Sequence, residues 1–152
     1  MTREDISPLD RLIIVKECEG LIARFAERND ARDADALAAM FVEDGSFARP
    51  TAPDKPVRGR EAIREQFRAR PANKMSRHIC ANTVVDVVSK TEANVVSYIL
   101  LFTATLEDGA TLPVEADAKK LLGAYRDRIV RDADGIWKFK ERIGSLAMTI
   151  EG

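Results

Sequence analysis

The sequence predicts an α+β fold in which helices come first and an antiparallel sheet follows. In the first half of the chain, apolar side chains recur every three or four residues, as they do along one side of a helix. From Ser76 onward the chain is rich in Ile, Val and Thr, and turn residues separate these runs, which is typical of strands. The 152 residues are the length of one domain, so we expect a single domain over residues 1–152.

Three helices are expected before the sheet. The first should run from Pro8 to about Arg28, with Ser7 as its N-cap. Asp33 can cap a second helix, because a short polar side chain accepts a hydrogen bond from the first free backbone N–H groups. A third helix is expected over residues 59–70, where Pro71 ends it.

Four long strands and a short one are expected. The long strands should cover residues 77–88, 94–105, 121–131 and 136–150, and the short one residues 46–49. Residues 106–120 contain an Asp-Gly pair and a proline, so we expect a loop there. Both faces of the second long strand are apolar, whereas a sheet with one solvated face would alternate. We therefore expect helices on one face and a second copy of the chain, in a homodimer, on the other.

Charge and motifs exclude several classes of function. The 24 Lys and Arg residues against 25 Asp and Glu give a formal net charge of −1, whereas nucleic-acid binders usually carry a basic excess. No apolar run is long enough for a membrane span, and the first residues do not form a secretory signal, so we expect a cytoplasmic protein. With one histidine, distant cysteines at Cys18 and Cys80 and no glycine-rich phosphate loop, we expect no metal and no cofactor.

Six segments in a fixed order resemble the SnoaL-like branch of the nuclear transport factor two-like superfamily. They are RFAERNDARDAD (24–35), FVEDG (41–45), GREAI (59–63), RHICAN (77–82), GAYRD (123–127) and DGIWKF (134–139). The resemblance implies a cystatin-like roll, in which a curved antiparallel sheet wraps around three helices to form a cone with an apolar pocket. It also implies assembly as dimers or trimers. The superfamily includes isomerases, dehydratases, cyclases and non-catalytic pocket proteins, so the resemblance indicates a fold rather than a reaction.

The candidate catalytic residues are His78 and Asp30. On the residues alone, a single histidine on a strand is usually structural, and Asp30 could simply end or cap a helix. Scytalone dehydratase and its relatives have a catalytic histidine in a similar strand and an aspartate in a similar break. The resemblance therefore implies that Asp30 holds the imidazole tautomer while the other ring nitrogen moves a proton. Two departures stand out: the chain has Asn29 where that dehydratase has a tyrosine, and it lacks a second histidine near Gly123.

The candidate substrate-binding residues are polar or aromatic. They are Tyr98, Tyr125, Asn82, Trp137, Phe25 and Phe41. For each there is a plainer interpretation: a buried tyrosine with a satisfied hydroxyl, an asparagine that caps a backbone group, or a core aromatic ring. Arginines also recur along the third helix, at positions 58, 60, 64, 68 and 70. We interpret them as a solvated face with ion pairs three residues apart, and the alternative is an anion-binding site.

Two functional hypotheses remain. In the first, the protein is a small enzyme without a cofactor, a lyase or isomerase such as a dehydratase or cyclase, which uses the Asp30–His78 pair on a hydrophobic substrate. In the second, it is a non-catalytic binding or assembly module for a hydrophobic small molecule. The distance between the two side chains discriminates between them, because a pair within about 3.2 Å at the floor of a pocket favours the enzyme.

Overall fold

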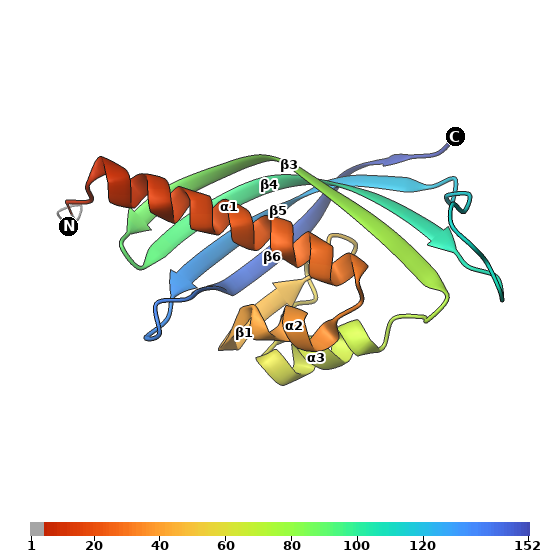
Figure 1. The fold of residues 1–152 in the computed structure, drawn as a ribbon, viewed down its shortest axis with the longest axis horizontal. Helices are drawn as coiled ribbons and strands as arrows, with labels where there is room; N and C mark the ends of the chain where they lie inside the picture. Colours follow the sequence, from red (N-terminus) through yellow and green to blue (C-terminus); the bar gives the residue numbers. More distant parts are fainter. Residues whose placement is uncertain (1–4) are drawn as a thin grey trace.

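The predicted α+β class is confirmed by a computed structural model, which describes residues 5–152 (Figure 1). The helices are α1 (Pro8–Asp30), α2 (Ala34–Ala39) and α3 (Arg60–Arg68). The strands are β1 (Phe41–Ala48), β2 (Val57–Arg58), β3 (Lys74–Ser89), β4 (Glu92–Thr105), β5 (Lys120–Arg131) and β6 (Trp137–Ile150). Each predicted helix and long strand is present, within three residues of its expected ends.

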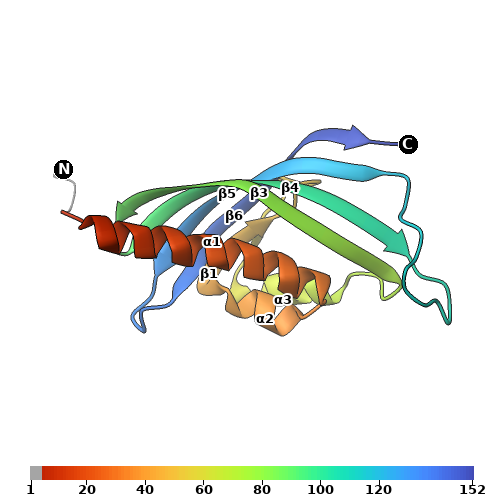
Figure 2. The same ribbon diagram turned by 45° about the horizontal axis from the view of Figure 1, so that its top comes forward.

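All of the described strands join one curved sheet, in the order β2-β1-β6-β5-β4-β3. Figure 2 shows α1 lying across the concave face of this sheet, with α2 and α3 beside it. The expectation of a purely antiparallel sheet is wrong in one place, because β1 pairs with β6 in parallel. Parallel neighbours need a long crossover connection, and α3 together with β3–β5 provides it.

Helix α1 carries the residues that close the site. Its N-cap is Ser7, as predicted, and the Ser7 hydroxyl accepts a hydrogen bond from the Asp10 backbone N–H at 3.1 Å. The apolar stripe of the helix faces the sheet and is buried from Ile14 to Phe25. The helix continues two residues beyond the predicted end, and this extra half-turn brings Asn29 and Asp30 to the inner face.

A β-bulge divides strand β3 into two halves with opposite faces. Between the pairs Ala81↔Tyr98 and Val84↔Val96, two residues of β3 lie opposite one residue of β4. Asn82 lies in this bulge with a φ of 53°. Because one extra residue moves the following side chains to the other face, Asn82 and Val84 do not share the inner face with His78, although an unbroken period-two alternation would place them there.

The core between α1 and the sheet is aromatic. Phe25 lies at its centre and its ring contacts the rings of Phe41, Phe47, Phe139 and Tyr125 at centroid distances of 5.5–6.4 Å. Such edge-to-face contacts stabilise a core beyond the area that they bury. Both cysteines are free, and within residues 5–152 no helix is both long and apolar enough to cross a membrane.

Candidate active site

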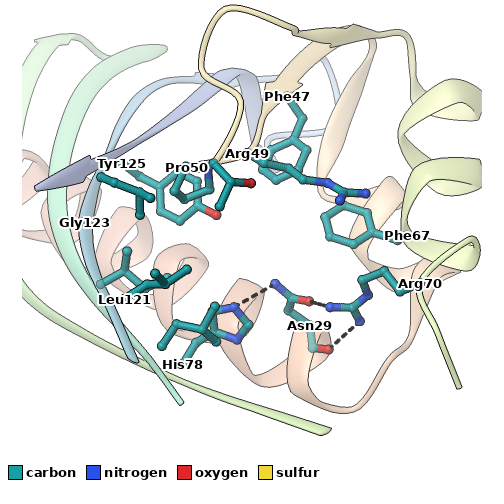
Figure 3. A pocket seen from close by; sticks show the side chains of 14 residues that line it. Asn29, Phe47, Arg49, Pro50, Phe67, Arg70, His78, Leu121, Gly123 and Tyr125 are labelled. Atoms are coloured by element: carbon teal, nitrogen blue, oxygen red, sulfur yellow. Dashed lines mark hydrogen bonds between the residues drawn. The ribbon is translucent and has the colours of Figure 1, made fainter. Parts of the chain in front are cut away.

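A cavity of about 210 Å³ lies between the inner face of the sheet and the ends of α1, β1 and α3 (Figure 3). Most of its wall is apolar and comes from Phe47, Phe67, Ile99, Leu101, Leu121 and Leu146. The polar residues that line it are Asn29, Arg49, Thr51, Arg70, His78 and Tyr125. Small-molecule sites usually combine an apolar wall with a few polar groups in this way, so the cavity is the candidate site.

His78 and Asp30 form the predicted pair. The His78 Nδ1 lies 2.5 Å from the Asp30 Oδ1. The His78 backbone N–H donates to the Asp30 Oδ2 at 3.0 Å, and the Ser76 hydroxyl donates to the Oδ1 at 3.0 Å. The two side chains are only 9% and 14% exposed. The carboxylate is thus held from two sides, and it holds the imidazole in one orientation.

The surroundings of Asp30 favour its ionised form. Burial alone would raise the pKa of the carboxyl group, but the hydrogen bonds from the His78 ring and backbone and from Ser76 outweigh burial and lower the pKa below its ordinary value. Asp30 is therefore a carboxylate at neutral pH. A carboxylate cannot donate, so the proton between the two side chains belongs to the His78 Nδ1.

Asn29 and Arg70 determine the state of the other ring nitrogen. The Arg70 Nη1 donates to the Asn29 Oδ1 at 2.5 Å, and its Nη2 donates to the Asn29 backbone oxygen at 3.0 Å. Because a guanidinium only donates, the amide oxygen must face Arg70, and the amide NH₂ then faces the His78 Nε2 at 3.5 Å (Figure 3). The Nε2 is consequently an acceptor. This contact is long, so a substrate proton can replace it.

Of the predicted binding residues, only Tyr125 lines the cavity. It is 3% exposed, and burial raises the pKa of its hydroxyl to about 12, so the phenol is neutral at neutral pH and able to donate a hydrogen bond. Tyr98 points the opposite way, to the outer face of the sheet, and is 51% exposed. Strand alternation explains this, because Ser97 and Ile99 on either side of Tyr98 face inward.

The other four predicted binding residues do not line this cavity either. Phe25 and Phe41 are fully enclosed in the core. Trp137 contacts a separate hollow near the ends of α1 and α2, and Asn82 is exposed at the bulge. The sequence shows that three of these side chains are aromatic and one is an amide. It does not show whether each one faces the cavity, the core or the solvent.

Sequence pattern did not identify most of the residues that line the cavity, and it placed Arg70 on a solvated face with anion binding only as the alternative. Phe47 and Phe67 form its aromatic wall, and Arg49 and Arg70 are its cations. Arg64 and Arg68 behave as predicted and bind Glu61 and Glu65 three residues away. Arg70 differs because it lies just past the end of α3 and turns inward toward α1. The available signal was Pro71, which ends the helix before Arg70 can continue the solvated face.

A second charged pair lies deeper in the core, behind Tyr125. The Arg142 Nη1 donates to the Asp127 Oδ2 at 2.7 Å, and both side chains are completely buried. The guanidinium carbon lies 3.8 Å from the centre of the Tyr125 ring and 4.4 Å from that of Phe25. Burial raises the pKa of the Asp127 carboxyl group to about 6, although the Arg142 charge opposes the rise.

Within the part of the chain that the structure describes, no three His, Cys, Asp or Glu side chains lie together as metal ligands would. The polar groups at the cavity include the His78 imidazole, the neutral Tyr125 phenol and the guanidinium groups of Arg49 and Arg70.

Comparison with known proteins agrees with the fold. The sequence model of a family described as "SnoaL-like domain" matches residues 10–143. No curated protein matches the chain. A candidate scytalone dehydratase from Novosphingobium aromaticivorans is 27% identical, with a TM-score of 0.80 over 96% of this chain and 92% of that one.

Two further solved structures share the architecture. A hexachlorocyclohexane dehydrochlorinase, LinA type 2, is 19% identical, with a TM-score of 0.78 over 96% of this chain and 93% of that one. An NTF2-like protein with a cystatin-like fold from Novosphingobium aromaticivorans is 24% identical, with a TM-score of 0.69 over 96% and 92%. At these identities the likeness is one of fold, and it confirms the predicted cystatin-like roll.

Proposed function

The chain belongs to the SnoaL-like domain family, and from that premise we propose that it is an acid–base enzyme, a lyase or isomerase, that acts on a hydrophobic small molecule with its own side chains. One observation carries this proposal. Asp30 holds the Nδ1 of His78 at 2.5 Å, and the Nε2 is left as an acceptor at an apolar cavity. This is the geometry that a general base requires.

In the proposed reaction, the His78 Nε2 removes a proton from a carbon next to a carbonyl group. The electron pair of the C–H bond becomes an enolate, and the neutral Tyr125 hydroxyl donates a hydrogen bond to its oxygen. Asp30 stabilises the imidazolium that forms. In a dehydration, the enolate then expels a hydroxyl group from the adjacent carbon, and the imidazolium returns its proton to form water. In an isomerisation, the proton returns to another carbon.

This scheme uses one histidine for both proton transfers, which suits a chain whose sequence contains only His78. Dehydration is the member of the reaction class that we favour, because the candidate dehydratase from Novosphingobium aromaticivorans is similar over nearly the whole chain. The competing proposal is a non-catalytic pocket protein. It would need the cavity but not the imidazole, so substitution of His78 separates the two.

The test is turnover of hydrophobic β-hydroxy ketones, followed by the ultraviolet absorbance of the conjugated product. His78→Ala removes the base and should lower turnover by about 100-fold or more. Asp30→Asn keeps the shape but removes the charge, so turnover should fall while the fold survives. Asp86→Asn, the same change at an exposed position of β3, is the matched control and should have no effect. Activity of His78→Ala equal to that of the wild type would leave only the pocket-protein proposal.

We also propose a homodimer, with a trimer as the alternative, formed through the outer face of β3 and β4. Large apolar side chains are exposed on these two strands: Ile79 (54%), Val84 (66%), Val88 (43%) and Tyr98 (51%). Exposed apolar patches often mark association sites. Light scattering should give twice the monomer mass at micromolar concentration, and Val84→Glu should lower it. A wild-type monomer would contradict the proposal.

A further inference from the structure

Two arginines from different elements line the same cavity as His78. Arg49 directly follows β1, and Arg70 lies two residues beyond the end of α3. Figure 3 shows both guanidinium groups on the side of the cavity where the Phe67 ring lies, across from Leu121. They therefore form one positively charged wall of the cavity that His78 also lines.

Neither arginine has a carboxylate partner within residues 5–152. Arg70 donates only to the side-chain and backbone oxygens of Asn29, and its Nε is buried without a hydrogen-bond partner. The Arg49 side chain makes no hydrogen bond or ion pair in the described part of the chain, and the residue is exposed. By contrast, Arg64 and Arg68 each bind acidic side chains on the surface.

The charge around this wall is not balanced. Burial lowers the pKa of Arg70, and the neighbouring charges of Arg32 and Arg49 lower it further, while only Asp30 acts in the opposite direction. Asp30 is already engaged by His78 and Ser76. Arg32 is occupied by the backbone oxygens of Arg70 and Lys74. A cavity wall with this excess of positive charge favours an anion.

We propose that the substrate carries a carboxylate group, which binds between Arg49 and Arg70 and directs the reacting carbon toward His78. This inference rests on the proposed function, because it takes the cavity as the substrate site. Each guanidinium would donate to one carboxylate oxygen, a charge-assisted arrangement that suits the planar shape of both groups. The aromatic rings of Phe47 and Phe67 would contact the apolar body of the substrate.

A carboxylate fits this wall better than a phosphate. Each terminal nitrogen of Arg70 already donates one N–H to Asn29, so Arg70 has fewer donors left for an anion than Arg49 has. A carboxylate has two oxygens to satisfy, whereas a phosphate has three and carries more charge. The proposal therefore specifies a carboxylate and not a phosphate.

The experiment is calorimetric binding of three probes of similar shape: 2-naphthoate, the neutral 2-naphthamide and 2-naphthyl phosphate. The wild type should bind the naphthoate at least about 10-fold more tightly than the amide, the fold-change expected for one charge-assisted hydrogen bond. Arg49→Gln should abolish this preference. That variant should fold normally, because Arg49 is exposed and its side chain makes no hydrogen bond in the described residues. Arg11→Gln, which removes an exposed charge near the start of α1, is the matched control and should keep the preference.

Three results would overturn the proposal: equal affinity for naphthoate and naphthamide, a preference that survives Arg49→Gln, or tighter binding of the phosphate. The result is independent of the catalytic proposal, because binding needs no turnover. His78→Ala should keep the naphthoate preference. If it does, and turnover is also unchanged in that variant, the carboxylate site stands and the acid–base function fails.

Discussion

Asp30 and Asp127 each pair with a basic side chain, but the two pairs have opposite surroundings. Asp30 receives hydrogen bonds from the ring and backbone of His78 and from Ser76, and these lower its pKa. Asp127 is bound only by Arg142 within the described residues, and burial raises its pKa to about 6. One oxygen of Asp127 and two nitrogens of Arg142 have no hydrogen-bond partner there.

Under the proposed function, the difference separates a chemical pair, Asp30–His78, from a packing pair, Asp127–Arg142. His78 can exchange a proton with a molecule in the cavity, and Asp30 is fully prepared to stabilise the charge that results. Arg142 cannot lose its proton, and its guanidinium is enclosed by the rings of Phe25, Tyr125 and Phe139 at 3.8–4.8 Å. Ion pairs in such places often cost as much in desolvation as they return in attraction.

The largest effect should come from breaking the packing pair. Arg142→Met leaves the Asp127 carboxylate buried without a counterion, so the free energy of unfolding at neutral pH should fall by about 3–5 kcal/mol. Urea denaturation followed by circular dichroism measures it. The double variant Asp127→Leu with Arg142→Met should recover most of the loss, because it removes both charges at similar volume. A loss no greater than that of Asp86→Asn would show that the two pairs do not differ in this way.

The two aspartates should also give stability opposite dependences on pH. Because the folded pKa of Asp127 is raised to about 6 from 3.8, the folded state holds the proton longer, and stability should fall as the pH rises from about 4 to 6. The shift corresponds to roughly 2–3 kcal/mol. Asp30 has a lowered folded pKa, so its contribution is present at neutral pH and is lost as the solution becomes more acidic than that pKa.

Denaturation curves that run from below pH 3.8 to neutral pH test both signs. In the double variant, which lacks the Asp127–Arg142 pair, the free energy of unfolding should no longer fall between pH 4 and 6. In Asp30→Asn, it should no longer fall as the solution becomes more acidic. If the double variant kept the same decrease, the raised pKa of Asp127 would not be its cause.

The smallest effect should come from replacing the Asn29 amide that contacts the His78 Nε2. Asn29→Asp keeps a partner for Arg70 but replaces the amide donor with an acceptor that faces the His78 Nε2. A carboxylate at this place accepts rather than donates, so it favours a proton on the Nε2 and blocks the base, and turnover at neutral pH should fall by about 10-fold. The acid limb of the pH–rate profile should move to higher pH.

Nitrogen NMR gives a direct measurement, since the sequence has one histidine and its ring signals need no assignment. The wild type should show a protonated Nδ1 and an unprotonated Nε2. The same tautomer in Asn29→Asp, with an unchanged pH–rate profile, would mean that Asn29 does not orient the base.

Several features of this molecule follow from neighbouring residues alone. Ser7 and Pro8 start α1, Asp33 caps α2, and the apolar stripe of α1 identifies its buried side, because capping and helical periodicity involve residues three or four positions apart. The Asp30–His78 pair was expected only through resemblance to a family. No local pattern relates two residues that are 48 positions apart.

Other features depend on contacts between distant segments. One extra residue at the Asn82 bulge reverses the faces of β3, so a period-two pattern read through it assigns the wrong residues to the cavity. Arg70 serves the cavity rather than the solvated face because the end of α1 happens to lie beside it. The parallel pairing of β1 with β6 and the buried Asp127–Arg142 pair arise in the same way. Local patterns describe which side chains an element exposes, but only packing determines what lies opposite them.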